Sequence, residues 1–359
     1  MPANLERIAI VDGDILTSFG HGINCCFDGL LEGRRALSHD DALVCTTGSG
    51  WLGRVSGINE TETRFDALLD ALAPDLLAPE TDIRILLAST LGNAPTANTP
   101  DRPGFALPGV DVFSAACASS SAALCFAADL LATGRETAVR VVAADALSEF
   151  VYSGFASLGA LDMEPSRPFD TSRAGLNLGE AAGWMLLMTE SRARSEGRAP
   201  RGYLAGWGQR NDAHHLTAPH REARGLIASI QAARERADSR GAAYPVVTYC
   251  AHGTGTRYND AMEMKAAKAC FSPPVPLWSV KGAIGHTLGA SGLVETWLAL
   301  HALERGVAPM TVGCTTPECP DGGVTLHNTP VTPDGLALTT NSGFGGINAA
   351  LLLQRGDAP

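Results

Sequence analysis

The chain has 359 residues, of which 45% are hydrophobic and 18% are charged. This composition supplies enough apolar material for a large core, so it indicates a folded globular protein made of two packed units or one duplicated unit. The formal net charge is −11 and no dense run of Lys and Arg is present, which argues against nucleic-acid binding.

The sequence shows no signals for secretion, membrane insertion or metal binding. Met1–Asp12 has no basic region followed by an apolar core, and no apolar run approaches the length that spans a bilayer. The nine cysteines lack paired metal-ligand spacing. Cys314 and Cys319 would form half of a zinc site, but no second pair completes it. We expect a cytoplasmic protein with reduced thiols, no metal and no membrane partner.

Apolar runs alternate with segments of helical spacing in the first part of the chain, which favours a layered α/β fold. Predicted strands are Arg7–Val11, Ile83–Ser89, Val110–Ala115 and Val139–Ala144, and predicted helices are Phe65–Leu77 and Ser119–Ala132. The charged segment Ser191–Arg201 interrupts this pattern. We therefore predict two halves, residues 1–201 and 202–359.

The second half has a similar order of elements. Predicted strands are Tyr203–Trp207, Pro245–Cys250 and Leu277–Val280, and predicted helices are Ala223–Ala237, Met262–Cys270 and Ser291–Leu303. In each half a strand leads directly into a turn with reactive side chains. This repetition favours a duplicated α/β fold.

Cys117 lies between a short apolar strand and a helix of small residues that begins near Ala118. The free N–H groups and the dipole at such a helix start favour a thiolate, which is the nucleophilic form of cysteine. A cysteine at this position is also compatible with a small buried apolar residue. The segment by itself leaves both interpretations open.

Two histidines lie in glycine-rich turns that precede helices. His252 belongs to the segment HGTGT at 252–256, and His286 follows Lys281 in the segment VKGAIGHTLGASG at 280–292. Either turn alone is compatible with a glycine-rich helix cap, but the pair with a nearby lysine indicates a catalytic site. A further glycine-rich turn is predicted at Thr339–Asn348, where N–H groups would face an oxyanion. It lacks the patterns of nucleotide-binding loops.

Six segments resemble the β-ketoacyl-acyl carrier protein synthase family of condensing enzymes. They are ACASSSAA around Cys117, PSRPFD at Pro165–Asp170, LGEAAG at Leu178–Gly183, HGTGT at 252–256, VKGAIGHTLGASG at 280–292 and NSGFGG at 341–346. The resemblance implies a thiolase-like fold with two similar α/β halves stacked in five layers. It also implies decarboxylative condensation of an acyl thioester with a malonyl-type extender, in fatty-acid, polyketide or polyene synthesis.

The resemblance further implies a role for individual residues. Cys117 carries the acyl group, His252 and His286 promote decarboxylation, and Lys281 supports this pair. In the family, the positions of Asp260 and Glu263 help to fix Lys281 and its loop, and those of Thr254 and Thr256 hold the phosphopantetheine arm. The position of Phe344 is a gating aromatic whose N–H joins that of Cys117 in an oxyanion hole. No cofactor or metal is implied, because phosphopantetheine arrives on the carrier protein.

Three departures from the family pattern limit this comparison. The gating segment NSGFGG is one residue shorter than usual and holds one phenylalanine, the span between Leu91 and Cys117 is short, and the whole chain is short. The acyl starter, the extender and the chain-length preference therefore remain open. A non-catalytic partner subunit of the chain-length-factor type, or an acyltransferase or hydrolase on the same fold, are the alternatives.

Two surfaces are candidates for partner binding. Arg192, Arg194, Arg198 and Arg201 form the densest basic cluster and would dock the acyl carrier protein, unless they belong to a solvated linker. The strand Val110–Ala115 would pair with a second subunit, either in a homodimer or in a heterodimer with a related chain.

Overall fold

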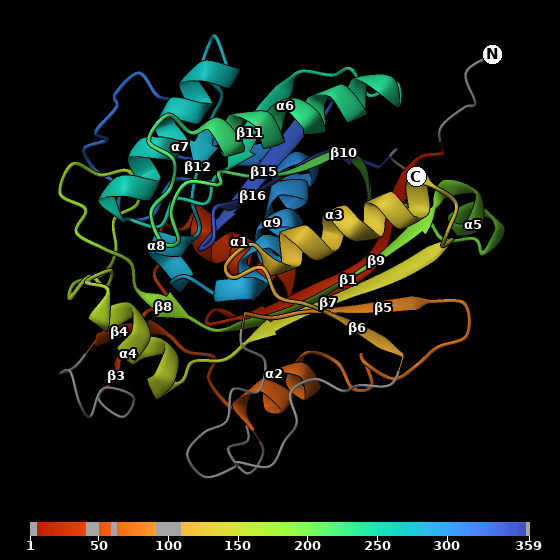
Figure 1. Cartoon of the computed structure of the whole chain (residues 1–359), viewed down its shortest axis with the longest axis horizontal. Coiled ribbons are helices and arrows are strands. Elements are labelled where there is room, and N and C mark those ends of the chain that lie inside the picture. Colours follow the sequence, from red (N-terminus) through yellow and green to blue (C-terminus); the bar gives the residue numbers. More distant parts are fainter. Residues whose placement is uncertain (1–5, 41–49, 59–62, 91–108, 357–359) are drawn as a thin grey trace.

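The computed structural model describes residues 6–40, 50–58, 63–90 and 109–356. One continuous sheet contains most of the strands, and helices lie against both of its faces (Figure 1). No helix of the described residues is long and apolar enough to cross a membrane.

Helices and strands alternate along most of the chain. The strands are β1 (Ile8–Thr17), β2 (Gly20–His21), β3 (Ser38–Asp40), β4 (Gly50–Gly53), β5 (Arg84–Ala88), β6 (Val110–Phe113), β7 (Ala138–Asp145), β8 (Leu178–Gly179), β9 (Ala181–Thr189), β10 (Gly202–Asn211), β11 (Val246–Cys250), β12 (Leu277–Trp278), β13 (Val307–Ala308), β14 (Thr329–Pro330), β15 (Leu336–Gly343) and β16 (Ile347–Arg355). The helices are α1 (Ile23–Leu31), α2 (Arg64–Leu72), α3 (Ser119–Ala132), α4 (Glu149–Ser157), α5 (Glu190–Ser195), α6 (Arg224–Ser239), α7 (Arg257–Cys270), α8 (Lys281–Ile284), the 3-10 turn η1 (Leu288–Ala290) and α9 (Ser291–Arg305).

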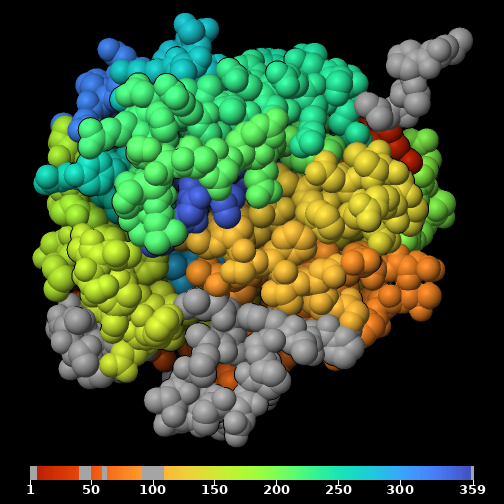
Figure 2. Space-filling model, viewed as in Figure 1, coloured from red at the N-terminus to blue at the C-terminus, as the bar shows by residue number. Residues whose placement is uncertain are grey.

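The two parts of the sheet have the same strand order. Outward from the centre, the first part runs β1-β9-β7-β5-β6 and the second runs β10-β16-β15-β11-β12. In both, the first three strands pair antiparallel with one another, and the third, fourth and fifth strands pair parallel. A short antiparallel contact between β1 and β10 joins the two parts. Figure 2 shows orange and yellow segments below and green to blue segments above.

Five layers result from this arrangement. The central helices α3 and α9 pack against strands of both parts, α2 covers the outside of the first part, and α6 with α7 covers the outside of the second (Figure 1). Helix α9 is buried on nearly all sides, which is what a helix between two sheets requires. Its buried Glu295 is therefore unusual, because a buried carboxylate needs an ion-pair or hydrogen-bond partner.

The α/β fold agrees with the prediction, and so do most of the predicted elements, with differences at their ends. The prediction of a turn at Thr339–Asn348 is wrong at both ends, because strand β15 continues to Gly343 and β16 begins at Ile347, so only residues 344–346 form the turn. The segment Ser191–Arg201 begins within helix α5, and β10 starts directly after it. The halves 1–201 and 202–359 stay a prediction. Most of the short span after Leu91 lies outside the described residues.

Candidate active site

Cys117 lies in a tight turn that joins β6 to α3. Ala116 has a φ of 49°, so the backbone reverses sharply just before the cysteine. The Ser119 hydroxyl closes the turn, because it accepts from the N–H of Ala115 at 2.9 Å and donates to the carbonyl of Ala116 at 2.6 Å. The thiol is thereby held at the start of a helix that is buried over most of its length.

Burial has a strong effect on this thiol. It raises the pKa of Cys117 to about 12, and the positive charge of Lys281 opposes this rise. Burial therefore opposes the thiolate that the helix start is predicted to favour. The thiol must lose its proton during the reaction.

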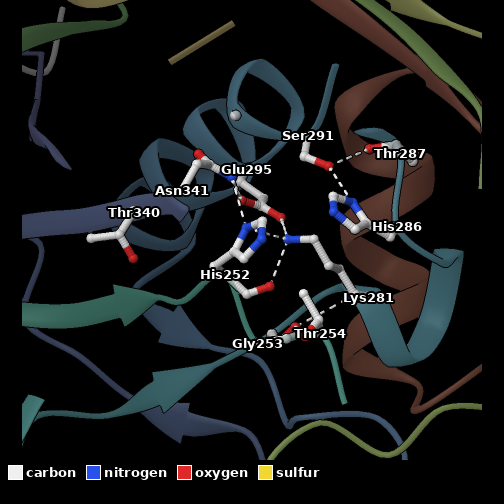
Figure 3. Close-up of polar contacts among 12 residues, drawn as sticks. His252, Gly253, Thr254, Lys281, His286, Thr287, Ser291, Glu295, Thr340 and Asn341 are labelled. Carbon is white, nitrogen blue, oxygen red and sulfur yellow. Dashed lines mark hydrogen bonds and ion pairs between the residues drawn. The ribbon is translucent and has the colours of Figure 1, made fainter. Parts of the chain in front are cut away.

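His252 follows strand β11 and is fixed by helix α7. The Glu263 carboxylate accepts from the N–H groups of His252 and Gly253, both at 2.7 Å. Nδ1 of the His252 ring lies 3.3 Å from Lys281 Nζ and 3.3 Å from Asn341 Nδ2 (Figure 3). Because both neighbours are donors, Nδ1 is the acceptor and the ring proton is on Nε2.

His286 is held in the same tautomer by a different set of contacts. Its backbone N–H donates to the carbonyl of Asn177 at 2.8 Å. Its Nδ1 accepts from the N–H of Leu288 at 3.2 Å and lies 3.1 Å from the Ser291 hydroxyl (Figure 3). Nδ1 is again the acceptor, and Nε2 carries the proton.

The two imidazoles are both neutral and lie side by side. Their ring centroids are 5.2 Å apart and their planes are nearly perpendicular, at 86°. Burial, with the charge of Lys281, lowers the pKa of both histidines well below the usual value. The pair therefore offers two neutral N–H donors.

Lys281 is 1% exposed and lies beside His252. Its Nζ donates to the His252 carbonyl at 2.6 Å and forms an ion pair with Glu295, which is also 1% exposed (Figure 3). The carboxylate of Glu263 binds the backbone after β11, which supports its expected role in the loop, but among the described residues it forms no hydrogen bond or ion pair that fixes Lys281. Glu295 from α9 has that role.

Asp260 fixes the remainder of the loop. Its carboxylate accepts from the N–H groups of Thr254 at 3.0 Å and Gly255 at 3.2 Å, and from that of Phe169 at 2.7 Å. The Thr254 and Thr256 hydroxyls lie 2.9 Å apart. The contacts of Asp260 support its predicted role in the loop, whereas among the described residues it forms no hydrogen bond or ion pair with Lys281.

Cys117, His252 and His286 line one cavity of about 390 Å³. Thr254, Thr256 and Phe344 line it as well, so the structure brings the predicted residues to one place. The ring of Phe344 stacks on that of Phe155 from α4, with centroids 5.7 Å apart. Gly343 lies against the nucleophile turn, because a Cβ atom at this position would be 2.7 Å from the carbonyl of Ala115. The oxyanion hole stays a prediction.

Sequence reasoning did not assign Glu295 and Asn341. Asn341 Nδ2 donates to Glu295 Oε2 at 2.8 Å, and its Oδ1 accepts from the Ser121 hydroxyl at 2.5 Å. A glutamate as the one acidic residue of the mostly apolar Ser291–Leu303 run was a detectable signal for a buried partner of Lys281. Nothing in the sequence pattern identifies Asn341 as a contact of His252.

The repeated strand order and the cavity with one cysteine and two histidines define a thiolase-like fold with a Cys-His-His site. Residues 108–193 match the family model of the beta-ketoacyl synthase N-terminal domain, and residues 201–315 match that of the C-terminal domain. The chain belongs to the beta-ketoacyl synthase family.

Individual relatives agree with this assignment. 3-oxoacyl-[acyl-carrier-protein] synthase 2 from Vibrio harveyi is 30% identical over 316 residues, which cover 84% of this chain and 73% of the relative. The mitochondrial 3-oxoacyl-[acyl-carrier-protein] synthase of Arabidopsis thaliana is 34% identical over 62% of this chain, but the match spans only 49% of its own length. A chain in the solved complex of a ketosynthase with its chain length factor from Xenorhabdus doucetiae superimposes with a TM-score of 0.80, at 25% identity and with 99% of each chain covered.

Proposed function

We propose that this protein catalyses the decarboxylative condensation of an acyl group on Cys117 with a malonyl-type extender carried by acyl carrier protein. The observation that carries the proposal is the common cavity, which holds a single cysteine thiol together with two neutral imidazoles. This set matches the needs of a thioester intermediate and of an enolate.

The first step transfers the acyl group. The Cys117 sulfur attacks the carbonyl of the carrier thioester, its proton passes to the departing carrier thiol, and acyl-Cys117 forms. Because the thiol is protonated at rest, the exchange is neutral overall and leaves no buried charge. The N–H groups at the start of α3 stabilise the negative charge that the Cys117 sulfur carries transiently during the transfer.

The second step releases carbon dioxide and forms the new bond. Loss of the extender carboxylate leaves its electron pair in an enolate, whose oxygen accepts hydrogen bonds from Nε2–H of His252 and His286. The enolate carbon attacks acyl-Cys117, and the resulting oxyanion is bound by the N–H groups of Cys117 and Phe344. The sulfur then leaves as a thiolate, which takes up one proton from solvent to restore the resting thiol. The residues of this chain carry each step without a metal or nucleotide.

Two alternative functions are less well supported by the site. A non-catalytic partner subunit does not need a nucleophile, whereas this chain holds Cys117 in a turn that the Ser119 hydroxyl fixes by two hydrogen bonds. A simple acyltransferase or hydrolase does not need two neutral N–H donors at one place, and here separate networks fix His252 and His286 in the same tautomer.

The partners follow from the same proposal. The carrier protein brings both thioesters to the cavity. The arginine cluster of α5 and its following segment is a poor docking site, because Arg192, Arg194, Arg198 and Arg201 each form an ion pair with a glutamate and none lines the cavity. In Figure 1, α5 lies at the opposite end of the molecule from α4 and α7.

Strand β6 is the end of the sheet path within the described residues, and its side chains are only partly buried. An edge of this kind favours pairing with another subunit. We expect a homodimer, since the catalytic set is complete in one chain. A heterodimer is the alternative, because the Xenorhabdus ketosynthase was solved with its chain length factor.

The test is a reconstituted condensation with malonyl-carrier and a set of acyl-carriers of different chain length. The proposal expects a β-ketoacyl-carrier, detected by the mass of the carrier, that is absent with Cys117→Ala. Release of free acid without chain extension would favour the hydrolase. Activity only after addition of a related subunit would favour the heterodimer, and such activity that survives Cys117→Ala would favour the non-catalytic partner subunit.

A further inference from the structure

A buried carboxylate outside the Cys-His-His set links the two catalytic turns. Asp145 is the last residue of β7 and is 2% exposed. One of its oxygens accepts from the Ser89 hydroxyl at 2.5 Å, and the N–H of Thr90 lies 2.9 Å from the other. That second oxygen also accepts from the N–H of Gly289 at 2.6 Å.

One side of this link leads to the nucleophile. The Thr90 hydroxyl donates to the carbonyl of Ala116 at 3.2 Å, and the Ser114 hydroxyl donates to the carbonyl of Thr90 at 3.1 Å. Thr90 therefore holds the turn at two residues just before Cys117, and Asp145 holds Thr90. Hydrogen bonds to an ionised group are stronger than those between neutral groups.

The other side leads to His286. Gly289 follows Leu288, whose φ is 51° and whose N–H donates to His286 Nδ1. A Cβ atom on Gly289 would lie 2.7 Å from both the Asp145 carboxylate and the N–H nitrogen of Thr90. Only glycine lets this turn approach so closely.

We propose that Asp145 is a positioning residue that sets the nucleophile turn against the His286 turn. This inference rests on the proposed condensation. The two turns come from different parts of the sheet, so neither local backbone geometry nor a shared helix aligns them. A carboxylate suits the task because both of its oxygens accept, whereas an amide would direct N–H donors against the N–H of Thr90 or Gly289.

Asp145 forms no ion pair with any residue that the structure describes. Burial raises the pKa of Cys117 first, and the charge of Asp145 adds to this rise against the opposing effect of Lys281. Removal of the Asp145 charge should therefore make the thiol easier to ionise.

The test compares Asp145→Asn with Asp170→Asn. Asp170 is a matched control, since it is also a buried carboxylate held by backbone N–H groups, those of Ser172, Thr315 and Thr316. We expect Asp145→Asn to transfer an acyl group to Cys117 within about threefold of the parent rate. The double variant Asp145→Asn with Cys117→Gln should decarboxylate malonyl-carrier within about threefold of the rate of Cys117→Gln alone. Condensation, which needs both turns in register, should fall by about tenfold to a hundredfold. Asp170→Asn should leave the ratio of the three rates unchanged.

Iodoacetamide alkylation of Cys117, followed by peptide mass spectrometry against pH, gives a readout that does not need the condensation. Asp145→Asn should move the profile to lower pH, whereas Thr90→Val, which loosens the turn without changing charge, should leave it in place and still lower condensation. A proportional loss of all three rates, or parental condensation, in Asp145→Asn would overturn the inference. If the parent protein condenses no substrate but the profile moves only in Asp145→Asn, the proposed function fails while the link from Asp145 to Cys117 stands.

Discussion

Replacement of Lys281 by methionine tests whether the buried lysine serves chemistry or stability. In the parent protein its ammonium contacts Glu295 and two atoms of His252. Lys281→Met leaves the Glu295 carboxylate buried, with the Asn341 amide as its remaining donor at 2.8 Å. Burial raises the pKa of Glu295 to about 7 against the opposing effect of Lys281, so without the lysine this carboxyl takes up a proton. Breaking a buried ion pair by removal of one partner costs about 3–5 kcal/mol in the free energy of unfolding.

The double variant Lys281→Met with Glu295→Met separates the two roles. It removes both charges and fills their volume with apolar side chains, so its free energy of unfolding should return to the parent value or above. Decarboxylation should still be lower by about a hundredfold, because His252 has lost the contacts that set its ring. Urea unfolding measures the first quantity and carbon dioxide release from malonyl-carrier measures the second.

The pH dependence gives an independent check on this variant. Burial, together with Lys281, lowers the pKa of His252, so protonation inactivates the parent site only well below pH 6.5. Without the lysine the pKa of His252 rises, and the loss of activity on acidification should begin at a higher pH. The exposed pair of Lys265 with Glu222 is the control, and Lys265→Met should change stability by no more than about 1 kcal/mol. Parental decarboxylation in the double variant would show that Lys281 is purely structural.

Three further predictions concern the nucleophile, the histidines and assembly. Cys117→Ala should abolish acylation and condensation, whereas Cys117→Gln should still release carbon dioxide from malonyl-carrier without a ketoacyl product; elongation by the alanine variant at the parent rate would contradict the role of the thiol. His252→Ala and His286→Ala should each accept an acyl group on Cys117 but lose decarboxylation by about a hundredfold, and normal gas release from either would exclude the donor role. Light scattering at micromolar concentration should give twice the chain mass, and a single species near 37.3 kDa would refute pairing through β6.

Much of the fold was predictable because its signals are local. The apolar runs at Ile83–Ser89 and Val139–Ala144 form the largely buried strands β5 and β7. Strand β1 extends to Thr17, well past its predicted end. A bulge lies between Ile10 and Asp12, and Asp12, Gly13 and Asp14 after it remain paired with β9. In sequence these three residues are typical of a turn, and only pairing with β9 keeps them extended.

The site was predictable to the extent that its residues lie in turns with recognisable patterns. Cys117, His252, His286 and Lys281 belong to such turns, and all come together at one cavity and its supporting network. The contacts between distant segments were not predictable in the same way. The pairing of Lys281 with Glu295 and the bond from Asp145 to Gly289 depend on how α9 packs between the two parts of the sheet. No pattern within one segment encodes that packing.

The most direct test of the central claim follows one acyl group through the reaction by intact-protein mass spectrometry. The purified protein is first incubated with an acyl-carrier and then chased with malonyl-carrier. We predict a mass increase located at Cys117, followed by its complete loss as an equal amount of β-ketoacyl-carrier appears. An acylated protein whose label is released as free acid, or one that stays acylated after the chase, would contradict the proposed condensation.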